Sequence, residues 1–136
     1  MAGKKVLVVS GRRKTATARA VVKQGVGRVR VNMVPVEILE PAIAREKVME
    51  PLLQAGEATW KQVDMDVKTL GGGYMGQAEA ARMAIANALL KWTKSGHLRT
   101  VFTEYDRTMV AGDSRRKETK KVGGAGARSK EQKSYR

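Results

Sequence analysis

The chain contains 136 residues, with 27 lysines and arginines against 13 acidic residues, and its formal net charge at neutral pH is +14. It has no cysteine, which excludes disulfides, thiolate zinc sites, iron–sulfur clusters and cysteine nucleophiles. The length suits one domain with one hydrophobic core.

The N-terminal part of the chain predicts three strands. Residues 5–10 form a short β-branched run, typical of a strand buried on both faces, which Gly11 is expected to end. The apolar part of this run is too short for a signal-peptide core or a membrane span, so we expect a cytosolic protein. Residues 15–24 predict a second strand, and residues 28–32 predict a third after a flexible turn at 25–27.

The third predicted strand alternates strictly between valine and polar residues. This alternation directs Val29 and Val31 toward the core and leaves the basic residues on the outer side. We therefore expect a basic face of the sheet, formed by Arg19, Lys23, Arg28 and Arg30.

The middle of the chain predicts short helical pieces and a strand. Pro41 and Pro51 bracket a segment that suits helices begun by proline, and Gly56 is expected to close it. Residues 60–70 then alternate between apolar and charged side chains, as in a half-buried strand. The residues expected in the core are Val63, Met65 and Val67, while Asp64 and Asp66 are expected to solvate the other face.

Two helices follow. Apolar residues recur every three or four positions over residues 77–94, which predicts the longest helix, with Gly96 placed to end it. Residues 98–105 predict a shorter one. The residues expected in the core are Ala78, Ala81, Ile85, Leu89 and Trp92 from the first helix, and Leu98, Val101, Phe102 and Tyr105 from the second. The chain thus predicts an α+β domain at residues 1–110 and an extended basic C-terminal tail at 111–136.

A glycine-rich motif at residues 71–76 matches G-x-G-x-x-G between a predicted strand and a helix, as in dinucleotide-binding proteins. That site also needs a following strand that ends in an acidic residue, and none is predicted. A Walker motif fails because Gln77 stands where its lysine should be. We expect Gly71, Gly72 and Gly73 either to turn the chain tightly or to let its backbone approach an RNA phosphate.

Other chemistry has little support in the sequence. His97 is the only histidine and follows a predicted helix end, where a cap or surface role is usual, so we expect no metal site. The carboxylates show no pairing for acid–base catalysis. We expect no enzyme activity, no cofactor and no small-molecule substrate.

The excess positive charge lies at the two ends of the chain. Residues 1–36 hold nine lysines and arginines and no acid, residues 37–114 hold nine against eleven acids, and residues 115–136 hold nine against two. Both ends therefore favour a polyanion. Glycines at 123–126 interrupt the amphipathic helix that a membrane surface would require, so nucleic acid is the expected partner.

The basic ends suit phosphate binding in two ways. Arg12, Arg13 and Lys14 are adjacent to small hydroxyl residues at the start of a strand, where they can grip phosphates. The tail is too poor in apolar residues to pack alone, and its small residues would let it thread between RNA helices. The plainer alternatives are a solvated loop and a disordered segment that keeps the protein soluble.

Three separated sequence segments resemble one family. They are GRRKTATARA at residues 11–20, GGG at 71–73 followed by QAEAAR at 77–82, and QKSYR at 132–136. Together they resemble the universal ninth protein of the small ribosomal subunit, in its archaeal and eukaryotic form. The resemblance spans nearly the whole chain.

The resemblance implies a two-layer α+β sandwich shared with the second domain of the small-subunit fifth protein, including a left-handed βαβ unit. It implies a place in the head of the cytoplasmic small subunit, on the 3′ major domain of the rRNA and beside other head proteins. The expected rRNA-binding residues are Arg12, Arg13, Lys14, Arg19, Arg28, Arg30, Arg115, Arg116, Lys117, Lys120, Lys121, Arg128 and Lys130.

The resemblance also implies that the tail reaches the peptidyl-tRNA site and meets the tRNA anticodon stem-loop. The residues that would contact the tRNA are Lys133, Ser134, Tyr135 and Arg136. The alternative is a free basic nucleic-acid-binding protein, for instance a chromatin component.

Overall fold

One five-stranded sheet forms a layer of the structure, in the spatial order β1-β2-β5-β3-β4. The computed structural model describes residues 5–136. Pairing is antiparallel for β1 with β2, β2 with β5 and β3 with β4, and parallel for β3 with β5. The strands are β1 (Val6–Arg13), β2 (Ala16–Gln24), β3 (Val29–Val31), β4 (Val34–Pro35) and β5 (Val63–Leu70).

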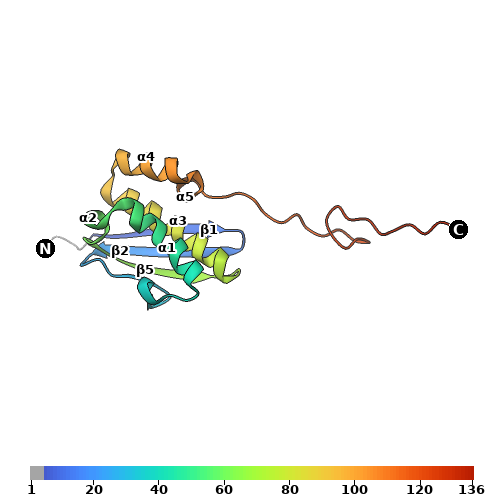
Figure 1. The fold of residues 1–136 in the computed structure, drawn as a ribbon, viewed down its shortest axis with the longest axis horizontal. Coiled ribbons are helices and arrows are strands. Elements are labelled where there is room, and N and C mark those ends of the chain that lie inside the picture. The colour runs from blue at the N-terminus through green and yellow to red at the C-terminus, as the bar shows by residue number, and fades with distance from the viewer. Residues whose placement is uncertain (1–4) are drawn as a thin grey trace.

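Helices form the second layer and cover one face of the sheet (Figure 1). The longest, α3, packs over β1 and β2 and against α1. Beyond α5, the chain runs away from the domain (Figure 1). The helices are η1 (Val36–Ile38), α1 (Ala42–Ala55), α2 (Glu57–Trp60), α3 (Tyr74–Thr93), α4 (Gly96–Tyr105) and α5 (Arg107–Ala111). The predicted α+β class is confirmed.

Small side chains bring the two layers close together. The inward residues of β2 begin with alanines, and α3 meets the sheet with a run of buried alanines. Gly11 lies within β1 under this helix, where an added Cβ would stand 2.3 Å from the carbonyl oxygen of Ala80. The prediction that Gly11 ends the first strand is therefore wrong, because the glycine serves close packing of a helix on the strand.

The predicted double burial of the first strand is also wrong. Val6 and Val8 are 57% and 55% exposed, whereas Val9 faces the core. β1 lies at the edge of the sheet, and the helices cover only one face. A continuous apolar run does not reveal which of its faces will be covered.

The turn at residues 25–27 does not form a hairpin between β2 and β3, because β5 lies between them. Asp64 of β5 organises this turn: the backbone N–H groups of Val26 and Arg28 each donate to its Oδ1 at 2.9 Å. The backbone N–H of Arg28 is the main cause of the lowered pKa of Asp64, with Val26 adding to it against some desolvation. Asp64 is thus a structural acceptor rather than only a solvating group.

The helix boundaries differ from prediction at two places. α1 continues through Pro51, which is buried in the core, so one lost backbone hydrogen bond is tolerated there. α3 ends at Thr93 and is followed by Lys94 in the left-handed region (φ 54°), whereas Gly96 is the first residue of α4. Ser95 caps α4 by accepting from the N–H of Leu98 at 3.3 Å.

Most predicted core residues are buried, including Met65, Ile85, Leu89 and Phe102. Tyr105 is an exception and is 50% exposed, because it ends α4 on the solvent side. Arg82 of α3 is also buried, although it is charged and was not among the predicted core residues. The short helices α2 and α5 were not predicted, since each is too short to show a periodic pattern.

Candidate nucleic-acid interface

The glycine turn packs directly against the hairpin that joins β1 and β2. Gly71 and Gly72 have φ angles of +75° and +64°, and a Cβ on Gly71 would lie 2.7 Å from the carbonyl oxygen of Thr15. Gln77 Nε2 donates to the carbonyl oxygen of Gly71 at 3.1 Å. Gly71 and Gly72 therefore form a tight turn, where their positive φ angles and the close approach of the β1–β2 hairpin both favour glycine. In residues 5–136, no further strand of the sheet follows α3, so the second half of a dinucleotide site is missing there.

The basic hairpin presents two of its three predicted cations to solvent. Arg12 and Lys14 are exposed, and Lys14 adopts the left-handed conformation at the turn (φ 53°). The side chain of Arg13, by contrast, is only 14% exposed. Arg12 and Lys14 of the hairpin are thus accessible to a partner, whereas Arg13 makes contacts within the protein.

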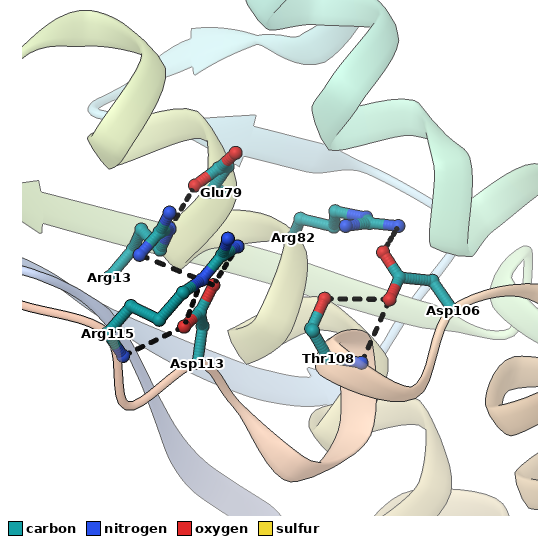
Figure 2. Close-up of polar contacts among 7 residues, drawn as sticks. All are labelled: Arg13, Glu79, Arg82, Asp106, Thr108, Asp113 and Arg115. Atoms are coloured by element: carbon teal, nitrogen blue, oxygen red, sulfur yellow. Dashed lines mark hydrogen bonds and ion pairs between the residues drawn. The ribbon is translucent and has the colours of Figure 1, made fainter.

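Arg13 joins β1, α3 and the start of the tail in a group that we call the tail-root cluster: Arg13, Glu79, Asp113 and Arg115 (Figure 2). Arg13 Nε donates to Glu79 Oε2 at 2.6 Å, and its Nη1 lies 3.4 Å from Asp113 Oδ2 as an ion pair. A parallel backbone bridge between Arg13 and Asp113 supports the same contact. The tail therefore leaves the domain beside the basic hairpin.

Asp113 is the centre of the tail-root cluster, and its side chain is 8% exposed. It accepts the backbone N–H of Arg115 at 2.9 Å and Nη2 of Arg115 at 2.7 Å. The Arg115 side chain, and then its backbone N–H, hold the pKa of Asp113 far below its ordinary value. The guanidinium of Arg115 is therefore paired with Asp113, although the side chain is 78% exposed.

A second charged group lies next to the tail-root cluster and ties three helices together (Figure 2). Arg82 of α3 donates from Nη2 to Asp106 Oδ2 at 2.8 Å, and its Nε lies 2.6 Å from Glu50 Oε2 of α1. Asp106 also caps α5 by accepting from the N–H of Thr108 at 2.9 Å. Burial alone would raise the pKa of Asp106, but hydrogen bonds from Thr108 and Arg82 outweigh it and lower the pKa.

An open groove of about 580 Å³ runs between the end of β1, α3 and the start of the tail. Its lining includes exposed cations and residues 110–114. The cations that line it are Arg12, Lys14 and Arg116. This arrangement brings the hairpin and the first residues of the tail, predicted separately along the sequence, to one place.

The predicted basic sheet face is partly neutralised by acidic neighbours from β5. Arg30 Nε donates to Asp66 Oδ1 at 2.9 Å, and Lys23 Nζ lies 4.0 Å from Asp66 Oδ2. Sequence reasoning missed this pairing because it treated β3 as a neighbour of β2. Arg19 and Arg28 are exposed and make no ion pair among the residues described.

The rest of the tail is exposed and contains no helix or strand from residue 114 onward. Turns occupy 122–128, next to a surface ion pair between Arg128 and Glu118 at 3.0 Å. Lys121 also lies 3.8 Å from Glu118. The C-terminus lies far from the domain (Figure 1). Several predicted site residues of the tail are exposed and make no ion pair within residues 5–136: Arg116, Lys117, Lys120, Lys130, Lys133, Ser134, Tyr135 and Arg136.

Metal and membrane features do not emerge from the described part of the chain. Residues 5–136 contain no group of three or more potential metal-binding side chains. They also contain no helix that is both long and apolar enough to cross a bilayer. His97 is exposed in the first turn of α4, which fits the surface role that was one of the two roles expected for it.

Replacing Asp113 by alanine should release the start of the tail. Arg13 and Arg115 would lose their shared partner, so we expect faster hydrogen exchange at the Arg115 amide and greater mobility of residues 113–116 by NMR relaxation. In the parent protein, the pKa of Asp113 is lowered, so ionised Asp113 stabilises the folded state. This stabilisation is complete above the ordinary pKa near 3.8 and is lost as the pH falls below it.

Glu118→Ala provides the matched control, because it removes an exposed tail carboxylate that pairs with Lys121 and Arg128. We expect no change at residues 113–116 in that variant, since exposed ion pairs contribute little. Equal exchange rates at Arg115 in the parent and Asp113→Ala proteins would show that the cluster does not hold the tail.

The chain closely matches known proteins over the hairpin, the glycine turn and the tail. A family model described as ribosomal protein S9/S16 matches residues 11–136. The chain is also 54% identical over 132 residues to the small ribosomal subunit protein uS9 of Methanothrix thermoacetophila. The matched region covers 97% of this chain and 99% of that protein. The chain therefore belongs to the ribosomal protein S9 family, whose members are structural, non-enzymatic components of the small ribosomal subunit.

Proposed function

We propose that this protein binds rRNA in the head of the small ribosomal subunit through its folded domain and reaches the peptidyl-tRNA site with its tail. Membership of the S9 family supports the ribosomal role. The observation that carries the proposal is the contrast between the two ends of the tail. Its root is held by Asp113, whereas its distal cations are exposed and make no ion pair with the described residues of the domain.

The proposed division of the chain is a globular RNA-binding domain at residues 1–110 and a basic tail at 111–136. The end of α5 at Ala111 supports this boundary. We also propose that the crossover from β3 through α1 to its parallel neighbour β5 is left-handed, as in the second domain of the small-subunit fifth protein. Ordinary crossovers have the opposite hand.

In this proposal, the domain meets the 3′ major domain of the rRNA mainly through phosphates. Arginine can grip a phosphate with two hydrogen bonds, and lysine adds a mobile charge. Arg13 and Arg115 would hold the start of the tail in place through the tail-root cluster. The exposed cations of the hairpin and tail would make the contacts with rRNA phosphates. The latter include Arg12, Lys14, Arg116, Lys117, Lys120, Lys121, Arg128 and Lys130.

The tip of the tail would contact the anticodon stem-loop of the peptidyl-site tRNA. Arg136 supplies a guanidinium, and Tyr135 is 87% exposed and free to stack on a base. Lys133 and Ser134 would add a charge and a hydroxyl donor behind them. These contacts would steady the tRNA without any chemical step.

Deleting residues 128–136 should weaken tRNA binding at the peptidyl site while leaving the subunit assembled. The deleted segment contains four cations and makes no contact with the folded core, so the domain should keep its unfolding midpoint. Filter binding of tRNA to reconstituted subunits, repeated at several salt concentrations, would measure the loss. We expect roughly tenfold weaker binding and a smaller salt dependence.

Arg99→Ala is a control that removes one exposed positive charge from α4, far along the chain from the tip. It should leave tRNA binding unchanged, whereas Arg136→Ala should reproduce part of the loss. Unchanged tRNA binding in fully assembled, truncated subunits would reject the tail's proposed role. A free chromatin-like protein, the alternative, would leave the small-subunit peak at moderate salt during sedimentation.

A further inference from the structure

The outer face of the sheet is the large surface that the helices leave uncovered (Figure 1). Strand register places its outward side chains in rows across the strands. One row runs Val8, Val21, Asp66 and Arg30, and the next runs Ser10, Arg19 and Lys68. Neighbours in a row lie within side-chain reach of one another.

The first of these rows is electrically balanced. Asp66 forms ion pairs with Arg30, from Oδ1 to Nε at 2.9 Å, and with Lys23 of the adjacent row, from Oδ2 to Nζ at 4.0 Å. Asp64 likewise stands opposite Lys23 in the register and accepts backbone N–H groups from the neighbouring turn. Both carboxylates of this half of the face are therefore engaged within the domain.

The second row is not balanced. Arg19 of β2 and Lys68 of β5 are direct register partners, both are exposed, and neither forms an ion pair in the described part of the chain. Like charges placed directly opposite each other on a sheet destabilise the pairing. Arg12 lies two residues beyond Ser10 on the same face of β1 and adds a third exposed cation. Folding alone does not favour this arrangement.

Hydroxyl groups accompany these cations. Ser10 is the register partner of Arg19, and Thr17 is the register partner of Arg12; both are exposed. Side chains of this kind commonly donate to phosphate oxygens alongside arginine and lysine. Nearby acidic groups, which would repel a polyanion, are confined to the other half of the face.

We propose that the exposed cations Arg12, Arg19 and Lys68 form a phosphate-binding surface that docks the sheet on an RNA helix, and we call it the open-face site. The inference rests on the proposed rRNA-binding function. It adds Lys68 to the RNA-binding residues and separates the cations of the sheet that bind RNA from those that pair within the domain. Lys23 and Arg30 serve to neutralise Asp66, while the open-face site supplies charge complementarity to RNA. The repulsion between Arg19 and Lys68 is relieved when phosphates lie between them.

Lys68→Glu tests the open-face site because folding and RNA binding should respond in opposite directions. The new carboxylate would face Arg19, so the unfolding midpoint of the full chain should rise by a few degrees. Binding to a transcript of the rRNA 3′ major domain should weaken by roughly 10- to 100-fold. The slope of log affinity against log salt should decrease by about 2, because one cation is lost and another is neutralised.

Arg99→Glu makes the same change in charge on an exposed residue of the helical layer, and we expect it to alter the slope by less than half as much. Lys68→Ala should give an intermediate slope without loss of stability. Equal effects of Lys68→Glu and Arg99→Glu would overturn the open-face site, since binding would then reflect only net charge. An unchanged RNA slope with loss of binding to a neighbouring head protein would also overturn it, in favour of a protein occupant.

The same measurements separate this inference from the function on which it rests. If the parent protein failed to bind the transcript more tightly than an unrelated RNA of equal length, the rRNA-binding proposal itself would fail. If the parent bound selectively and Lys68→Glu bound equally well, only the open-face site would fail.

Discussion

Replacing Gly11 by alanine is expected to destabilise the folded domain by about 3 kcal/mol, one of the largest effects of any single methyl group in this protein. The added Cβ would lie 2.3 Å from the carbonyl oxygen of Ala80 and 2.7 Å from the backbone N of Ala84. Both atoms belong to the backbone of α3, so no side-chain rotation relieves the contact. The helix would have to lift from β1, where it makes its most extensive contact with the sheet.

Thermal unfolding of the full chain would measure this effect as a fall in the midpoint of about 12–20 °C. Gly96→Ala is the matched control, because it introduces the same methyl group with nothing within 4 Å and lies at the start of a helix. The control should be neutral or stabilising by up to about 1 kcal/mol. A Gly11→Ala protein as stable as its parent would mean that α3 does not pack on β1 at this distance.

Replacing Arg82 by alanine is the second change with a large expected effect, about 3 kcal/mol of lost stability. The guanidinium is 6% exposed and stands between Glu50 of α1 and Asp106 at the junction of α4 and α5. Its removal would leave two carboxylates close together without their cation, and Glu50 is itself only 19% exposed. The cost falls at the lower end of the range for buried pairs, because Asp106 is 33% exposed and can be partly rehydrated.

A double-mutant cycle with Glu50 distinguishes charge pairing from lost packing. Once Arg82 is absent, Glu50→Ala should cost less than it does alone, because it then removes a largely buried carboxylate whose one remaining partner among the described residues is Lys47. Chemical denaturation of the four proteins would give the coupling. Additive effects would contradict a charge-based role. Lys47→Ala serves as a control, because Lys47 is the other partner of Glu50, at 3.0 Å within α1.

Several elements were predictable because their signal is local. The alternation in residues 60–70 has the period of a half-buried strand, and β5 follows it with Val63, Met65 and Val67 in the core. The apolar spacing of the long helix was equally informative, and α3 extends the prediction by a few residues at its start. Periodicity of this kind depends only on neighbours within one element.

Other predictions failed where the deciding contact lies far along the chain. Burial of β1 on both faces was wrong because a helix covers only one side of an edge strand. The burial of Arg82 was not predicted, because nothing near it in sequence shows that Glu50 and Asp106 converge on it. Pro51 was expected to bound a helix, yet its packing in the core outweighs one missing hydrogen bond.

Composition and local pattern were thus sufficient for the basic ends, the α+β class, the glycine turn and the family resemblance. They did not reveal which cations are free. That was decided by the strand order, which inserts β5 between β2 and β3 and sets Asp66 beside Arg30 but Lys68 beside Arg19. It was also decided by contacts such as Arg13 with Glu79, 66 residues apart. Charge pairing depends on distance in space, and local periodicity specifies only the face on which a side chain lies.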